Sequence, residues 1–165
     1  MSQPKFFDII QPVLQFPSSS LFRSHEWELK SWYVTVNSGA IYSSGVHVDA
    51  GDSILCNMTR TGPDSWVVLG TLNGGKGAVQ RQSATNARLK LQPWAYNTLE
   101  CYGCKGCDTY PQKPITFTEN KLYQAGKLLE IPGSLWAVNP KPSDKLKCHE
   151  KTAVAANGDT TISFQ

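Results

Sequence analysis

Hydrophobic and polar positions alternate with a period of two in short segments along most of the chain. In residues 28–36, Trp32 and Val34 fall on one side, while Tyr33 and Thr35 fall on the other. Because successive side chains of a β-strand point to opposite faces, this alternation of aromatic and β-branched residues predicts a strand. Further strands are predicted at residues 46–48, 53–59, 65–72, 78–82, 88–91, 94–102, 115–118, 134–138 and 160–164.

Turn residues separate the predicted strands at fairly even spacing. Asp49–Asp52 and Thr61–Asp64 predict turns, and Asn73–Gly75 supplies the positive φ angles that a tight hairpin needs. One short helix is predicted at Glu119–Gln124, and the Pro- and Lys-rich residues 139–144 predict a surface loop. Many short strands at this spacing predict one all-β domain over residues 1–165. We expect a two-sheet antiparallel β-sandwich of the concanavalin-like or jelly-roll-like kind.

Composition and charge narrow the classes of function. The 165 residues suffice for one full core, and 40% of them are hydrophobic, as in ordinary globular proteins. Sixteen basic residues against 13 acidic ones give a formal charge of +3, scattered without the basic stripe of a nucleic-acid-binding protein. No apolar run approaches the roughly 20 residues that span a bilayer. We therefore expect neither nucleic-acid nor membrane binding; the oligomeric state stays open.

The compartment stays open as well. The apolar patch near the N-terminus is interrupted by Asp8, whereas a secretion signal needs about 7–15 uninterrupted apolar residues. The expectation is a cytosolic protein or the mature form of a secreted one. Asn57-Met58-Thr59 is a sequon for N-linked glycosylation, which is used only if the chain is secreted.

Five cysteines allow three interpretations. They are Cys56, Cys101, Cys104, Cys107 and Cys148. Three of them lie in one Cys-x-x-Cys-x-x-Cys run, which suggests a zinc site with Cys148 or His149 as the fourth ligand. Structural zinc sites usually combine two separated Cys-x-x-Cys pairs, so disulfides or free thiols are favoured over a metal. We expect no metal and no cofactor.

The familiar catalytic motifs are absent from the sequence. His25, His47 and His149 show no paired spacing, and no Gly-x-Ser-x-Gly elbow occurs. The glycine-rich residues 74–77 lack the spacing of a phosphate-binding loop. Serine-nucleophile and nucleotide chemistry therefore have no support in the sequence.

Several short motifs follow one another between residues 13 and 118. They are Val13-Leu14-Gln15-Phe16, Ser31-Trp32-Tyr33, Val48-Asp49-Ala50-Gly51-Asp52-Ser53-Ile54, Asn57-Met58-Thr59, Thr98-Leu99-Glu100-Cys101-Tyr102 and Ile115-Thr116-Phe117-Thr118. In the order and spacing of these motifs the chain resembles the glutamic peptidases, or eqolisins. Departures are Asn97, where the family has a Trp, and Val34-Thr35, where it has Glu-Trp. Family members are also typically acidic, secreted and made with a propeptide, whereas this chain is mildly basic.

The resemblance implies an acid-acting endopeptidase with Gln15 and Glu100 as its catalytic pair on a concave sheet face. Glu100 would take the proton of the attacking water, and the Gln15 amide would stabilise the oxyanion by donating a hydrogen bond. A glutamate ordinarily ionises near pH 4.3, which favours work in acid. Trp32 and Trp94 are the candidate substrate-binding residues, for a polypeptide in a concave groove.

Other interpretations remain beside the peptidase. A polar residue in a strand usually faces solvent without a catalytic role, and Trp residues of a sandwich are more often core than ligand platforms. The leading alternative is a non-enzymatic, lectin-like module that binds a glycan or peptide in the same groove. A structural or defence protein without a small-ligand site is the third.

Overall fold

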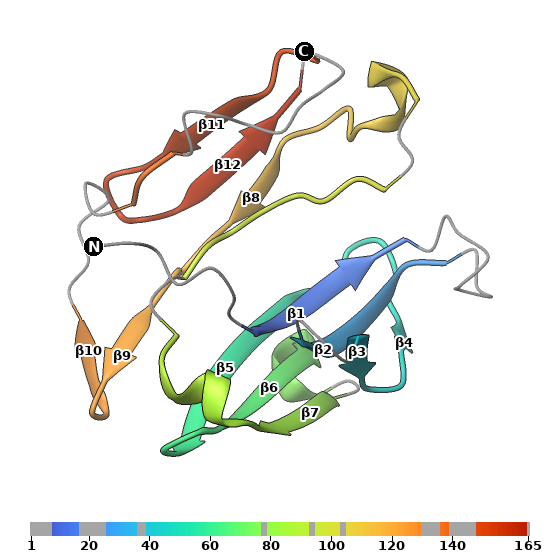
Figure 1. The fold of residues 1–165 in the computed structure, drawn as a ribbon. Coiled ribbons are helices and arrows are strands. Elements are labelled where there is room, and N and C mark those ends of the chain that lie inside the picture. Colours follow the sequence, from blue (N-terminus) through green and yellow to red (C-terminus); the bar gives the residue numbers. More distant parts are fainter. Residues whose placement is uncertain are drawn as a thin grey trace. The chain divides into compact units, whose positions relative to one another are not determined.

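The computed structural model of the chain divides into two compact units (Figure 1). Unit 1 comprises Met1–Ala95 and unit 2 comprises Tyr96–Gln165, and each is described by itself. The residues described are 8–16, 26–35, 39–76, 79–92, 95–102, 105–129, 136–138 and 148–164. That residues 1–165 form a single domain stays a prediction.

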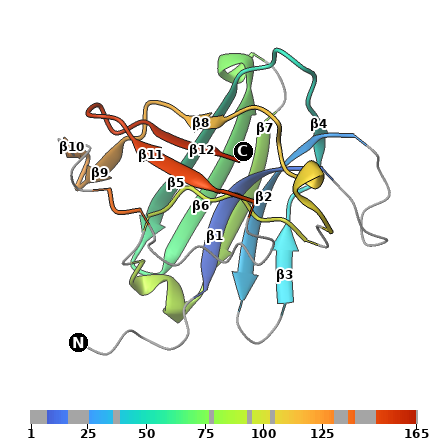
Figure 2. The ribbon, with the colours of Figure 1, turned by 90° about the horizontal axis from the view of Figure 1, so that it is seen from above.

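Unit 1 is built from two antiparallel sheets. Its strands are β1 (Ile9–Gln15), β2 (Glu28–Thr35), β3 (Gly39–Tyr42), β4 (Val46–His47), β5 (Ile54–Gly62), β6 (Ser65–Leu72) and β7 (Val79–Thr85). Sheet A has the order β1-β2-β3, with β4 also paired to β2, and sheet B has the order β5-β6-β7. Figures 1 and 2 show the two sheets of unit 1 as two layers, with the blue strands of sheet A over the green strands of sheet B.

The core of unit 1 lies between these sheets. One buried cluster joins residues of both sheets and the following segment: Ile10, Tyr33, Val68, Ala84 and Leu89. A second joins Leu29, Val48 and Leu72. The sheets approach so closely that a Cβ on Gly70 would lie 2.9 Å from Leu29 Cγ. Glycine at position 70 is therefore a requirement of the packing between the sheets.

Unit 2 contains a third antiparallel sheet and a hairpin. Sheet C has the order β11 (Lys151–Val154), β12 (Thr160–Ser163), β8 (Ile115–Phe117). The hairpin joins β9 (Leu122–Gln124) to β10 (Lys127–Leu129). A disulfide links Cys107, in the short 3-10 helix η3 (Cys107–Thr109), to the fully buried Cys148. This covalent bond ties the irregular chain before β8 to the segment that enters β11.

The predicted all-β sandwich is confirmed. The strand predicted at 65–72 is β6, and those at 28–36, 46–48, 53–59, 78–82, 115–118 and 160–164 correspond to β2, β4, β5, β7, β8 and β12. The turn predicted at Asn73–Gly75 joins β6 to β7, with positive φ angles at all three residues. No helix among the described residues is long and apolar enough to cross a membrane.

Some predicted elements are wrong. Residues 88–91 fall in and just after the 3-10 helix η2 (Ala87–Lys90), because the Asn86 side chain accepts a hydrogen bond from Arg88 N and caps it. Residues 95–102 carry no strand, and neither do 136–138, the described part of the strand predicted at 134–138. Residues 93–94, 134–135 and 139–144 lie outside the described residues.

The helix predicted at Glu119–Gln124 is also wrong. Its last three residues form β9, and Ala125 and Gly126 both have positive φ angles, as a two-residue β-hairpin turn requires. Glu119 has a φ of 53°, which a right-handed helix does not accommodate. Local backbone conformation therefore overrides the helical propensity of this segment.

Candidate functional site

Gln15 is the last residue of β1 and lies opposite Glu28 in β2. Ile10, in the same strand, and Tyr33, its partner, belong to the core between sheets A and B. Since side chains alternate along a strand, Gln15 lies on the other side of the sheet, which we name the outer face of sheet A. Its Nε2 atom is buried and has no hydrogen-bond partner among the described residues. A buried amide donor without an acceptor is costly, and such groups occur at functional sites.

Glu28 is held in place by its neighbours. Lys30 Nζ lies 3.1 Å from Glu28 Oε2, and the two side chains are only 12% and 21% exposed, respectively. Gly45 crosses this pair so closely that a Cβ there would lie 2.7 Å from Lys30 Cε and 2.9 Å from Glu28 Cδ. The Glu28 carboxylate is therefore engaged in an ion pair on the outer face of sheet A.

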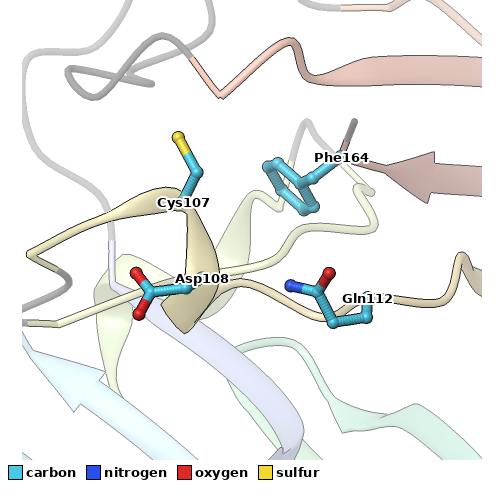
Figure 3. A pocket seen from close by; sticks show the side chains of 4 residues that line it. All are labelled: Cys107, Asp108, Gln112 and Phe164. Carbon is cyan, nitrogen blue, oxygen red and sulfur yellow. The ribbon is translucent and has the colours of Figure 1, made fainter.

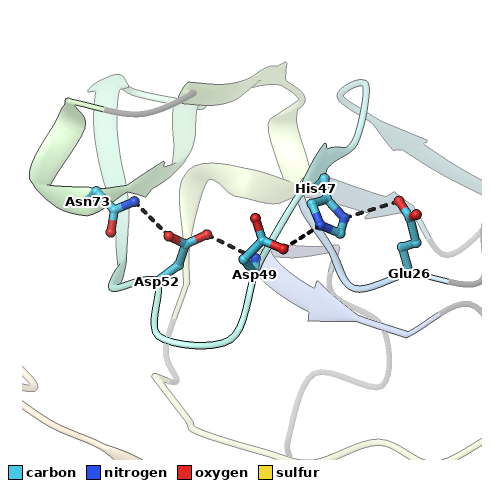
Figure 4. Close-up of polar contacts among 5 residues, drawn as sticks. All are labelled: Glu26, His47, Asp49, Asp52 and Asn73. Atoms are coloured by element: carbon cyan, nitrogen blue, oxygen red, sulfur yellow. Dashed lines mark hydrogen bonds and ion pairs between the residues drawn. The ribbon is translucent and has the colours of Figure 1, made fainter.

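His47 lies on the neighbouring strand β4, opposite Glu28 in the β2–β4 pairing. Gln15, Glu28 and His47 therefore form a row across three strands of sheet A. Its ring lies between two carboxylates, with Nδ1 3.1 Å from Glu26 Oε2 and Nε2 2.9 Å from Asp49 Oδ1 (Figure 4). The hydrogen bond to Asp49, followed by the charges of Asp49 and Glu26, raises the pKa of His47 above its usual value. Only the protonated ring donates from both nitrogens, so this geometry favours imidazolium.

The Asp49–Asp52 turn that follows is fixed by its own hydrogen bonds. Asp49 N donates to Asp52 Oδ2 at 2.9 Å, and Asn73 Nδ2 donates to Asp52 Oδ1 at 2.8 Å (Figure 4). The bond from Asn73, with that from the Asp49 backbone, lowers the pKa of Asp52. These hydrogen bonds tie the Asp49–Asp52 turn, which precedes β5, to Asn73 in the turn that follows β6.

Aromatic rings lie beside the charged row on sheet A. The ring centroids of Trp32 and Tyr42 are 4.5 Å apart, and Lys30 Nζ lies 5.3 Å from the Tyr42 centroid. Trp32 lies opposite Tyr42 in the β2–β3 pairing, and its neighbours Ser31 and Tyr33 are buried toward the core. The predicted substrate-binding residue Trp32 is therefore on the same outer face as Gln15. The other, Trp94, lies outside the described residues.

Glu100 lies in unit 2, in the irregular segment 95–102 rather than in the strand predicted there. Its Oε2 accepts a hydrogen bond of 2.6 Å from the Tyr102 hydroxyl, and this bond raises the pKa of Tyr102. Asn97 anchors the segment, since its Nδ2 donates to Asn120 Oδ1 at 3.1 Å and to the buried Thr160 Oγ1 at 2.8 Å. Asn97 thus has a structural role in holding this irregular segment.

Gln15 and Glu100 therefore belong to different units. The pairing of the two side chains in one groove stays a prediction. Neither residue lines the pocket found in unit 2, which has a volume of about 370 Å³ and is lined by Cys107, Asp108, Gln112 and Phe164 (Figure 3). Gln112 Nε2 donates to its neighbour Tyr110 O, so the amide is already engaged.

Of the four described cysteines, three are in disulfides and Cys56 is free. Cys107 pairs with Cys148, and Cys101 is disulfide-bonded as well. Cys56 has a free thiol, and desolvation raises its pKa to about 11, which makes it a weak nucleophile. Among the residues described, no group of three or more His, Cys, Asp or Glu side chains is arranged to hold a metal ion.

The comparison with solved structures shows a relationship at the level of the fold. The crystal structure of aspergilloglutamic peptidase from Aspergillus niger matches 87% of this chain and 84% of its own, with a TM-score of 0.57 and 16% sequence identity. No protein-family model and no curated protein matches the sequence. The chain therefore has the fold seen in a glutamic peptidase.

Sequence reasoning missed much of the row on sheet A. The register puts Gln15, Glu28 and His47 side by side on three strands, with Lys30 and Tyr42 next to them. Strand β3, which carries Tyr42, was not predicted, because its four residues show too little alternation. The spacing Glu28-x-Lys30-x-Trp32 does place three side chains of this site on one strand face, and that pattern was available in the sequence.

Proposed function

We propose that this protein is an acid-acting endopeptidase that uses Gln15 and Glu100 in glutamic-peptidase chemistry. The observation that carries the proposal is the buried, unpartnered Nε2 of Gln15 on the outer face of sheet A. Its position matches the upstream glutamine of the eqolisin pattern, and the similarity in fold to aspergilloglutamic peptidase supports the same interpretation.

The chemistry divides between the two side chains. Glu100, as a carboxylate, takes a proton from a water molecule that attacks the substrate carbonyl, and it later returns a proton to the leaving amine. The Gln15 amide donates to the oxyanion that forms, so an N–H group without a partner in the free protein gains one in the transition state. Tyr102 donates a hydrogen bond to Glu100 and is proposed as the residue that positions it.

The test is cleavage of denatured casein by the purified protein across pH 2–7. We expect cleavage that is strongest in acid, and a loss of about 100-fold or more in Gln15→Ala, since removal of one oxyanion donor has that effect. Gln11→Ala is the matched control, because Gln11 lies on the same face of β1, four residues before Gln15. It should retain activity.

A second set of variants tests the role of the Glu100 carboxylate. Glu100→Gln should abolish cleavage, whereas Glu119→Gln, which changes an exposed carboxylate in the same unit, should not. Tyr102→Phe should shift the pH profile of cleavage, because it removes the donor to Glu100. If Glu100→Gln remained active and Glu28→Gln did not, the base would be Glu28 and the proposed assignment would be wrong.

A ligand-binding module is the second candidate. It is favoured by the paired rings of Trp32 and Tyr42 on sheet A, the latter 48% exposed with a lysine over its ring. Exposed aromatic rings of this kind stack on sugars or on peptide side chains. If the folded protein shows no cleavage at any pH, but retains a glycan or peptide that Trp32→Ala releases, this candidate replaces the peptidase.

A further inference from the structure

Strand β5 carries the sequence Asn57-Met58-Thr59 at the edge of sheet B, where β6 is its one partner among the described strands. All three residues are exposed. Ile54 packs against a core cluster, and Cys56 lies opposite Gly70, where an added Cβ would lie 2.9 Å from Leu29 Cγ. Since side chains alternate along the strand, Asn57 and Thr59 lie on the face of sheet B that is turned away from this core.

The two sequon side chains are already in contact. Thr59 Oγ1 donates a hydrogen bond of 2.7 Å to Asn57 Oδ1. The Nδ2 atom of Asn57 makes no hydrogen bond to the described residues, so a substituent on that nitrogen displaces no interaction of the fold. No other Asn-x-Ser/Thr triplet occurs in the 165 residues.

A second, independent observation concerns the compartment. Cys107 and Cys148 form a disulfide, and Cys101 is disulfide-bonded too. Disulfides form and persist in oxidising environments such as the secretory pathway, and they are rare in the cytosol. The same compartment holds the machinery that glycosylates sequons.

From these observations we infer that Asn57 is an acceptor site for an N-linked glycan. An oligosaccharide is transferred from a lipid-linked diphosphate donor. The bond between sugar C1 and the diphosphate oxygen breaks, and the bond between C1 and Asn57 Nδ2 forms. The amide loses one proton, and the lipid diphosphate leaves with the bonding electrons. The glycan covers the open edge of sheet B, which would otherwise offer unpaired backbone groups to another chain.

The experiment is translation of the full chain, behind a secretion signal, into microsomes that carry the glycosylation machinery. We expect the mass of the chain to increase by one glycan, and peptide-N-glycosidase to remove that glycan. In ¹⁸O water the enzyme converts the glycosylated asparagine to a labelled aspartate, which peptide mass spectrometry should locate at Asn57. Asn57→Gln and Thr59→Ala should each lose the added mass completely, and Thr59→Ser should retain it.

Thr61→Ala is the matched control, because it makes the same change two residues along the same exposed strand and leaves the sequon intact. It should be glycosylated like the wild type. A translocated wild-type chain without added mass would overturn the inference, as would added mass that persists in Asn57→Gln. The inference does not depend on peptidase activity. If the glycosylated protein unfolded at lower urea concentration than the same protein after glycosidase treatment, the outward placement of Asn57 would be contradicted.

Discussion

The hydroxyl of Tyr33 provides a sharp test of how the core of unit 1 is stabilised. Tyr33 lies in β2, is 5% exposed, and donates a hydrogen bond of 2.7 Å to Oδ2 of the fully buried Asp8. Arg88 contributes less, since its Nη1 lies 3.8 Å from Asp8 Oδ1 and its side chain is 42% exposed. Tyr33→Phe removes the hydroxyl and keeps the ring, so the change tests the contacts of that hydroxyl, above all its hydrogen bond to the buried Asp8 carboxylate.

The expected magnitude follows from that geometry. A hydrogen bond to a charged group contributes about 1.5–3 kcal/mol. We therefore expect Tyr33→Phe to lower the free energy of unfolding by about 2 kcal/mol at neutral pH. Arg88→Ala, the comparison variant, should cost no more than about 1 kcal/mol, because one side of that ion pair is in water.

The effect also depends on pH. Burial, together with the hydrogen bond to Asp8, raises the pKa of Tyr33 from 10.0 to about 12. The folded state thus holds this proton more tightly than the unfolded state. Its contribution is fully present below pH 10 and is lost as the pH rises toward 12. The difference between wild type and Tyr33→Phe should therefore shrink over that range.

Urea unfolding followed by tryptophan fluorescence measures both quantities. A difference below about 0.5 kcal/mol at neutral pH would show that the hydroxyl does not stabilise Asp8 as described. A difference that stays constant to pH 12 would show that folding does not raise the pKa of Tyr33, contrary to the linkage argued above.

Three further predictions concern packing, covalent structure and charge. Gly70→Ala should lower the free energy of unfolding by about 1–3 kcal/mol, because the new Cβ meets the fully buried Leu29. The loss should be smaller in a Leu29→Val background, and a strictly additive double-mutant cycle in urea unfolding would contradict this. Cys148→Ser removes a disulfide with a sequence separation of 41 and should lower the free energy of unfolding by about 4 kcal/mol, by the chain-entropy relation. A midpoint of thermal unfolding equal to that of the wild type would refute this prediction. The pKa of His47, measured by NMR titration, should lie above 6.5. The charged ring then stabilises the fold below pH 6.5, and this stabilisation is lost as the pH rises through the pKa of the folded state. A midpoint at or below 6.5 would rule out the contacts with its carboxylate neighbours.

Local patterns in the sequence determined much of the fold. The alternation in residues 28–36 and 65–72 predicted β2 and β6, and Asn73–Gly75 predicted the turn after β6, because strand faces and positive φ angles depend on neighbouring residues. The all-β class followed from the same patterns. Gln15 was singled out from the order of motifs, and the structure adds that its amide nitrogen is buried without a partner.

Only the tertiary structure decided which distant residues meet. The register of β1, β2 and β4 brings Gln15, Glu28 and His47 into one row, and a shift of one residue would turn these side chains to the other face. Asp8, which in the sequence merely interrupts an apolar patch, is fully buried because the hydroxyl of Tyr33 reaches it. Such contacts join residues far apart in the chain and depend on packing between elements, which local spacing does not encode.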